Sequence, residues 1–153
     1  MYTAQFSAVA VTAAQDLFEI TAPADAVVRI HQIEFAQYTD TGDAQEEIFS
    51  IKFKRGQTTS GSGGSSVTPA LLQFGFPAAG STVEANNTTI ASTGTISTLY
   101  SSAWNIRSPF LWLPTPEMRI HLSPSQRFTV ENLTAPTDSV TMNGTIVFEE
   151  LGG

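Results

Sequence analysis

Cysteine is absent from the 153-residue sequence. Its absence excludes disulfide bonds, thiol catalysis and thiolate metal ligands, and it leaves the redox compartment open. A chain of this length is the size of one domain. It buries roughly 68–70% of the surface that its unfolded form exposes, so it needs no disulfide or metal in order to fold. We therefore expect a single domain spanning residues 1–153.

Positively charged residues are scarce. Lys and Arg number 7 against 14 Asp and Glu, which gives a formal net charge of −7. Such a chain lacks the basic surface that binds nucleic acid or anionic lipid, so we expect neither a nucleic acid nor a membrane as partner. A negative charge of this size also keeps free copies apart and soluble.

Long apolar runs are missing too. No stretch approaches the roughly 20 apolar residues that a membrane-spanning helix needs. The small residues Ala8, Val9 and Ala10 resemble a signal-peptide cleavage site, but no positive charge precedes them, since Arg29 is the first basic residue. We therefore expect no signal peptide.

The sequence also lacks any long window in which apolar residues repeat at helical spacing. Short runs rich in Val, Ile, Phe and Thr recur between turn signals, which is typical of an antiparallel sandwich or barrel. The clearest alternation spans 47–55, where Phe49, Ile51 and Phe53 face one way. We expect an all-β, single-domain antiparallel β-sandwich, jelly-roll-like, with eight or nine strands. The expected strands are 3–11, 16–21, 27–36, 47–55, 95–106, 110–113, 119–122, 127–133 and 141–149.

The remaining segments are assigned from the same signals. Residues 119–122 and 127–133 are expected to pair with each other, because the short turn 123–125 joins them. Residues 71–76 form an apolar run that ends at a proline, and the polar stretch 82–93 is expected to be a loop.

Two groups of aromatic residues are candidates for contact with another chain. Residues 1–7 are expected to form an N-terminal arm, in which Tyr2 and Phe6 add to the edge of a neighbour's sheet. Trp104 and Trp112 flank a proline-bounded segment. Each is either part of the core, which is the usual place of Trp in a sandwich, or part of a subunit interface.

A Gly/Ser-rich loop is expected over residues 56–69. Its glycines Gly61, Gly63 and Gly64 supply backbone freedom, and they also allow the backbone to approach another chain closely. The loop does not match a phosphate-binding loop, because neither a following lysine nor the start of a helix is present.

Candidate chemistry is sparse. His31 and His121 would need a carboxylate such as Glu34 or Glu117 to complete a zinc site, and the competing interpretation is a pair of hydrogen-bonded strand histidines. The acidic segment 40–47 offers oxygen ligands for calcium but does not follow the EF-hand order. No GxSxG motif occurs. We therefore assign no catalytic residue, no metal ligand and no cofactor.

The sequence nevertheless resembles a family of proteins of about this length that are encoded by tailed-phage genomes and prophages and are regarded as virion structural proteins. The resemblance covers most of the chain. Its most specific part is Arg55-Gly56 followed by Thr59-Ser60-Gly61-Ser62-Gly63-Gly64. The matching stretches are GDAQEEIFSIKFKRGQTTSGSGGSSVTP at 42–69, WNIR at 104–107, PE at 116–117, MNGT at 142–145 and FEE at 148–150.

The resemblance implies a capsid decoration (cement) protein. Such a protein would be made in the host cytoplasm, would bind the major capsid protein on the outer surface of the head, and would assemble with itself, with a homotrimer as the expected state. The family has no catalytic residues to carry over, so the resemblance implies a protein that is not an enzyme.

Two other functions stay open at the sequence level. A carbohydrate- or receptor-binding module of a phage tail or fibre would need an exposed Trp104 or Trp112 beside polar side chains. A hydrolase would need His31 and His121 to share a cleft with a nucleophile or a metal.

Overall fold

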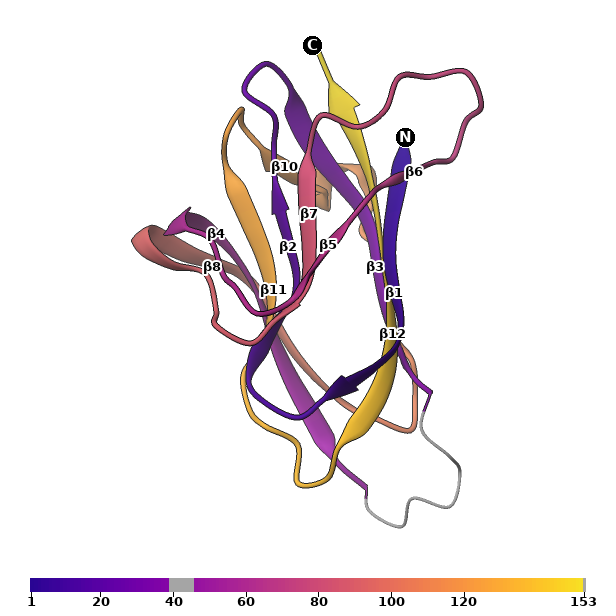
Figure 1. The fold of residues 1–153 in the computed structure, drawn as a ribbon, viewed down its shortest axis with the longest axis vertical. Coiled ribbons are helices and arrows are strands. Elements are labelled where there is room, and N and C mark those ends of the chain that lie inside the picture. Colours follow the sequence, from indigo (N-terminus) through magenta and orange to yellow (C-terminus); the bar gives the residue numbers. More distant parts are fainter. Residues whose placement is uncertain (39–45, 153) are drawn as a thin grey trace.

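A computed structural model describes residues 1–38 and 46–152 of the chain (Figure 1). Apart from one turn of 3-10 helix, η1 (Pro116–Met118), the regular elements in these ranges are strands. None of the helices found there is long and apolar enough to cross a membrane. The strands are β1 (Tyr2–Val11), β2 (Gln15–Thr21), β3 (Val27–Gln37), β4 (Ile48–Thr59), β5 (Ser65–Val67), β6 (Ala70–Leu71), β7 (Thr82–Asn87), β8 (Ser92–Asn105), β9 (Phe110–Trp112), β10 (Ile120–Leu122), β11 (Arg127–Asn132) and β12 (Val140–Leu151).

The strands form two antiparallel sheets that pack face to face. Sheet A has the order β10-β3-β12-β1-β6, and β9 also pairs with β3 on the side that β10 occupies. Sheet B has the order β5-β7-β2-β11-β4-β8. Figure 1 shows the two layers with both chain ends at the same end of the sandwich. The expected all-β antiparallel sandwich is confirmed.

The connectivity is that of a jelly roll. Eight of the strands pair from the outside of the sequence inward: β1 with β12, β2 with β11, β3 with β10, and β4 with β8. This long hairpin wraps so that β12 meets β3 in sheet A and β11 meets β4 in sheet B. Two Greek keys closed in this way define the jelly-roll fold.

The described residues contain twelve strands rather than the eight or nine expected. The three additional strands are β5, β6 and β7, in a region where no strand was assigned from the sequence. In β7 only Val83 and Ala85 face the core, while Glu84 and Asn86 lie on the other face. Two small apolar residues give too weak an alternation to predict a strand from sequence.

The expected pairing of 119–122 with 127–133 is wrong. Strand β10 pairs with β3 in sheet A, and β11 pairs with β2 and β4 in sheet B. The turn between β10 and β11 crosses from one sheet to the other. It runs beside the connection between β2 and β3, where Ser125 N–H donates to the Pro23 carbonyl at 3.0 Å.

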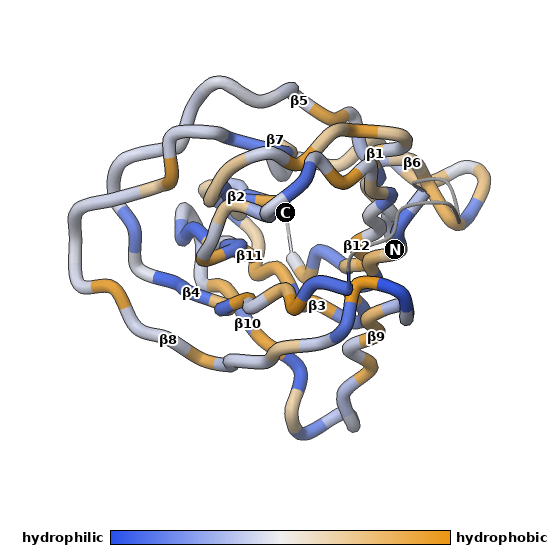
Figure 2. Tube along the Cα trace, turned by 90° about the horizontal axis from the view of Figure 1, so that it is seen from below, coloured by the Kyte–Doolittle hydropathy of each residue, from blue (hydrophilic) through white to orange (hydrophobic). Residues whose placement is uncertain are grey.

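The core lies between the sheets and is rich in phenylalanine. Hydrophobic and hydrophilic residues alternate along many of the strands (Figure 2), so each sheet turns an apolar face inward. Phe49, Ile51 and Phe53 of β4 are buried, as their alternation predicts. Each such side chain contributes about 1.5–3 kcal/mol on burial. The largest buried rings come from both sheets: Phe18, Phe35, Phe53, Phe128 and Phe148.

Candidate interaction surfaces

The N-terminal segment 1–7 belongs to the body of the sandwich. From Tyr2 onward it is β1, which pairs with β12 on one side and with β6 on the other. Tyr2 and Phe6 are buried, and the Phe6 ring centroid lies 5.2 Å from that of Phe18. A Cβ on Gly144 would lie 2.4 Å from the Phe6 ring, so glycine makes room for it. The expected contact arm is therefore an internal strand, because its apolar residues find partners in their own chain.

The two tryptophans pack against the core and are half-buried. The Trp104 ring centroid lies 5.7 Å from that of Phe49 and 5.0 Å from that of Phe110. Trp112 meets Phe53 edge to face at 5.3 Å, and its remaining surface lines a groove. Neither ring stands alone on an open face.

Two loops cross the outer face of sheet B, and we call them the crossing loops (60–64 and 88–91). Between β4 and β5 the chain passes over β11, β2 and β7. Between β7 and β8 it passes back over β2, β11 and β4. Ser62 and Thr89 join the two loops through a pair of backbone hydrogen bonds of 2.9 Å each. The expected loop 56–69 is thus held on the protein surface, and its first and last parts belong to β4 and β5.

The glycines of this segment make close contacts within the chain. A Cβ on Gly61 would lie 2.6 Å from the Thr89 carbonyl oxygen, and a Cβ on Gly64 would lie 2.2 Å from that of Ala85. Gly63 has a φ of +86° and would meet the Thr88 hydroxyl at 2.4 Å. Close approach of backbone to backbone inside one molecule accounts for Gly61 and Gly64, and the positive φ accounts for Gly63.

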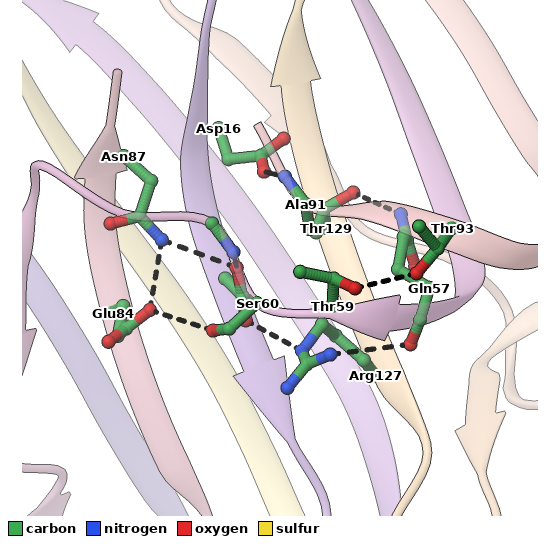
Figure 3. Close-up of polar contacts among 12 residues, drawn as sticks. Asp16, Gln57, Thr59, Ser60, Glu84, Asn87, Ala91, Thr93, Arg127 and Thr129 are labelled. Atoms are coloured by element: carbon green, nitrogen blue, oxygen red, sulfur yellow. Dashed lines mark hydrogen bonds and ion pairs between the residues drawn. The ribbon is translucent and has the colours of Figure 1, made fainter. Parts of the chain in front are cut away.

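Beneath the crossing loops lies a polar cluster, most of whose members are labelled in Figure 3. It consists of Asp16, Glu19, Gln57, Ser60, Glu84, Asn87, Arg127 and Thr129. Glu19 of β2 is its centre and is only 2% exposed. One carboxylate oxygen accepts from Gly61 N–H at 2.8 Å and from the Asn87 amide at 3.2 Å. The other accepts from the Ser60 hydroxyl at 2.5 Å and lies 2.6 Å from Arg127 Nε. Glu19 thus ties the crossing loops to the sheet.

Asp16 is the second buried acid of the polar cluster. One of its oxygens accepts from Ala91 N–H at 2.7 Å, and the other, Oδ1, has no partner in the described residues. The pKa of Asp16 is raised from its ordinary value of 3.8 to about 7: burial is the largest cause, the charges of Glu131 and Glu19 add to it, and the Ala91 hydrogen bond and the Lys54 charge oppose it. The carboxyl is therefore neutral below neutral pH.

The two histidines lie on the outer face of sheet A, each with a partner. His31 Nε2 lies 3.0 Å from Glu149 Oε1, which also binds Arg29 Nη1 at 2.9 Å. Arg29 Nε donates to His121 Nε2 at 3.1 Å. Burial alone would raise the pKa of Glu149, but the hydrogen bond and charge of His31, together with Arg29, lower it below its ordinary value.

The two metal hypotheses concern the histidines and the acidic segment 40–47. Within residues 1–38 and 46–152, no group of three His, Asp or Glu side chains is placed to hold a metal ion. Glu34, a possible third zinc ligand, accepts a hydrogen bond from Gln32 at 3.3 Å. The calcium hypothesis concerns 40–47, and most of that segment lies outside the described residues.

An exposed apolar loop follows β6. We call residues 72–77 the apolar loop, and Figure 1 shows the connection between β6 and β7 projecting from the sandwich. Phe74 is fully exposed, while Leu72 and Phe76 are 55% and 52% exposed. The loop contains no charged residue. Apolar side chains gathered at one protruding point are typical of a contact surface.

A second apolar surface lies at the opposite edge of sheet A. There β9 and β10 pair with β3, and β8 of sheet B lies alongside. The hollow between them, which we call the edge groove, has a volume of about 350 Å³. Leu111, Leu113 and Met118 are each more than half exposed. The lining residues are Leu99, Tyr100, Leu111, Trp112, Leu113, Pro114, Thr115, Met118 and Ile120.

Of the residues singled out from the sequence, only Trp112 lies on either apolar surface. Tyr2 contacts only the last residue of the apolar loop: its hydroxyl donates to the Pro77 carbonyl at 3.2 Å. The apolar run 71–76 was a usable signal, because it contains four large apolar side chains, of which only Leu71 lies in a paired strand. The edge groove gives no such signal, since its residues come from three strands and a turn.

No family model matches this sequence, and no curated protein matches it. Among solved structures, the chain is similar to VP17, a capsid protein of bacteriophage P23-77, over 94% of this chain and 90% of that chain. The sequence identity is 9% and the TM-score is 0.17. A likeness at that level decides neither the fold nor the function.

Proposed function

We propose that this chain is a virion structural protein that decorates the outside of a tailed-phage head, where it binds the major capsid protein and stabilises the shell. The observation that carries the proposal is a jelly roll with apolar surfaces at two opposite edges. Jelly rolls are frequent among viral capsid proteins, although lectins and cupins share the fold. The resemblance on residues 42–69 supports the phage assignment.

Stabilisation of a shell follows from mass action. A protein that binds the assembled shell and not its free subunits shifts the equilibrium toward the shell. Many symmetric copies turn individually weak contacts into a large total. The net charge of −7 keeps unbound copies soluble, while the apolar loop and the edge groove provide uncharged contact areas.

A carbohydrate- or receptor-binding role on a tail is supported less well. Sugar sites combine an aromatic platform with several polar groups, whereas the edge groove around Trp112 offers a lining of mainly aliphatic and aromatic side chains. Trp104 is packed between Phe49 and Phe110. Binding to a glycan array, lost on Trp112→Ala, would favour this role over decoration.

We also propose that the chain is not an enzyme. The buried acids Glu19 and Asp16 bind the crossing loops, and the histidines bind Glu149 and Arg29. These groups are engaged in holding the fold together. A turnover assay that responds to a His31→Ala, His121→Ala double substitution would contradict this part of the proposal.

The decisive experiment uses the virus whose genome encodes this chain. Electron microscopy of purified particles should show added density on the outer head surface, and particles made without the gene should lack that density. The gene-deleted heads should release their DNA at lower temperature, and readdition of the purified protein should restore the original value. An unrelated acidic protein serves as the control. Absence of the protein from purified particles, or its presence on the tail alone, would overturn the proposal.

A further inference from the structure

We propose that the apolar loop of one copy inserts into the edge groove of a second copy, so that the chains join head to tail into a closed ring. The inference deepens the proposed function, on which its biological purpose rests, by naming the surfaces through which copies meet.

The apolar loop is fixed at both ends and free at its tip. On one side β6 pairs with β1, and Leu72 N–H donates to the Met1 carbonyl at 3.1 Å. On the other side Gly80 and Ser81 donate to the Glu150 carboxylate at 3.1 and 2.8 Å. A loop held in this way loses little conformational entropy when its tip binds, because its ends are already ordered.

The edge groove matches the loop in chemistry. Of the described residues that line it, none is charged, and the polar side-chain groups are those of Thr115, the Tyr100 hydroxyl and the Trp112 indole N–H. Joining it to an uncharged loop buries no ionised side chain, so the contact avoids the desolvation cost that a charged surface would bring. This matters for a chain of net charge −7, whose other surfaces repel a second copy.

The positions of the two surfaces dictate the kind of assembly. The loop follows β6 at one edge of sheet A, and the groove lies beside β9 and β10 at the other edge. A loop therefore cannot fill the groove of its own chain. When two different patches meet, the contact is heterologous, and repetition gives either a ring or an open filament. A decoration protein with a finite copy number at each symmetry point requires the ring.

The area of the contact also favours a ring over a pair. A large aromatic residue buries 150–250 Å², so Phe74, Phe76 and Leu72 together offer on the order of 400 Å². With an equal area from the groove, one contact buries roughly 800 Å², which is below the 1,200–2,000 Å² of stable interfaces. A closed ring gives each copy two contacts, and its last contact forms within the assembly at a high effective concentration.

Disulfide trapping tests the geometry, and the absence of native cysteine leaves no background. A Phe74→Cys copy mixed with a Leu113→Cys copy should give a cross-linked pair under mild oxidation. The double variant F74C/L113C should give closed cross-linked rings rather than pairs alone. An Ile48→Cys copy, whose native side chain is 63% exposed, is the matched control for Leu113→Cys at 67%. Cross-linking of Phe74→Cys to itself, or equally to Ile48→Cys, would overturn the proposal.

Sedimentation of the purified chain gives a second readout. The loop variant F74S/F76S and the groove variant L113D/M118D should each weaken association at least tenfold. A mixture of the two retains one intact loop and one intact groove, so it should stop at a one-to-one pair. Groove variants that associate like the unmodified chain would contradict the inference. Rings that form in solution without binding to heads would leave the inference standing and would refute the proposed function.

Discussion

Two segments that lie close together in the sequence differ in how they contact the body of the sandwich. The polar, Gly/Ser-rich segment 60–64 is pressed onto sheet B, where its backbone binds Glu19 and Thr89. The apolar loop 72–77 projects into solvent, although it contains two phenylalanines whereas 60–64 contains only serine and glycine.

The difference shows that available partners decide where a segment lies. Sheet B presents buried acceptors on its outer face, and backbone N–H groups satisfy them at close range. The core between the sheets is already filled by rings such as Phe6 and Phe18, so the loop has no apolar site of its own to occupy. A segment that its own chain leaves unpartnered is the one to examine for external contacts.

The largest expected effect on stability comes from removing the carboxylate that holds segment 60–64 on sheet B. Glu19→Ala removes the acceptor of Gly61 N–H and one of the two carboxylates to which Ser60 and Asn87 donate, and it leaves the partly buried Arg127 without its charge partner. We expect a loss of about 3–5 kcal/mol in the free energy of unfolding. Urea unfolding followed by tryptophan fluorescence measures it, with the more exposed Glu84→Ala as control. A loss below about 1 kcal/mol would mean that the crossing loops stay in place without Glu19.

Asp16→Asn should stabilise the protein at high pH. Because the folded state holds the Asp16 proton up to about pH 7 while the unfolded chain releases it near 3.8, stability falls as pH rises between these values. One pKa unit corresponds to about 1.4 kcal/mol, so the penalty above pH 7 is on the order of 4 kcal/mol. The variant should recover most of it at pH 8 and none at pH 3. Parallel pH–stability curves for the two proteins would refute this account.

Gly64→Ala should have a smaller effect of about 1–3 kcal/mol, because its Cβ would lie 2.2 Å from the Ala85 carbonyl oxygen and strand β7 must shift. Gly80→Ala is the matched control, since its nearest new neighbour, the Pro23 Cβ, lies 3.1 Å away. Thermal unfolding of both variants measures the contrast. Equal melting temperatures would show that segment 60–64 is not closely packed.

The smallest expected effect belongs to the apolar loop. The double substitution F74S/F76S should change the free energy of unfolding of the monomer by less than about 0.5 kcal/mol, because exposed side chains contribute little to the fold. Urea unfolding at low protein concentration provides the measurement. A loss above about 1.5 kcal/mol would show that these rings stabilise the monomer. The apolar loop would then not differ from segment 60–64 in its contribution to the fold.

Much of the fold was predictable from local patterns. The alternation of Phe49, Ile51 and Phe53 predicted the buried face of β4, and turn signals located most of the long strands. Strand β7 was missed because Val83 and Ala85 are its only core residues. Strand pairing was harder to predict. No local sequence pattern indicates that β10 pairs with β3 in sheet A instead of with the next strand, β11.

The candidate surfaces were less predictable than the fold. Tyr2 and Phe6 were assigned to an arm because an apolar chain end looks the same whether a neighbour or its own chain covers it. Gly61 and Gly64 were interpreted as possible contacts between chains, although backbone of the same chain lies against them. Sequence patterns report that a side chain needs a partner, and only the three-dimensional arrangement identifies which partner it has.

The pairing of β1 with β12 determines when sheet A can be completed as the chain is synthesised. Tyr2 lies opposite Phe148, so one flank of β1 stays open until β12 has been synthesised. Sheet A cannot close before that point, and strands that pair across such long sequence separations assemble slowly. Newly made chains therefore pass through a stage with exposed strand edges, at which crowding or heat would divert them into aggregates.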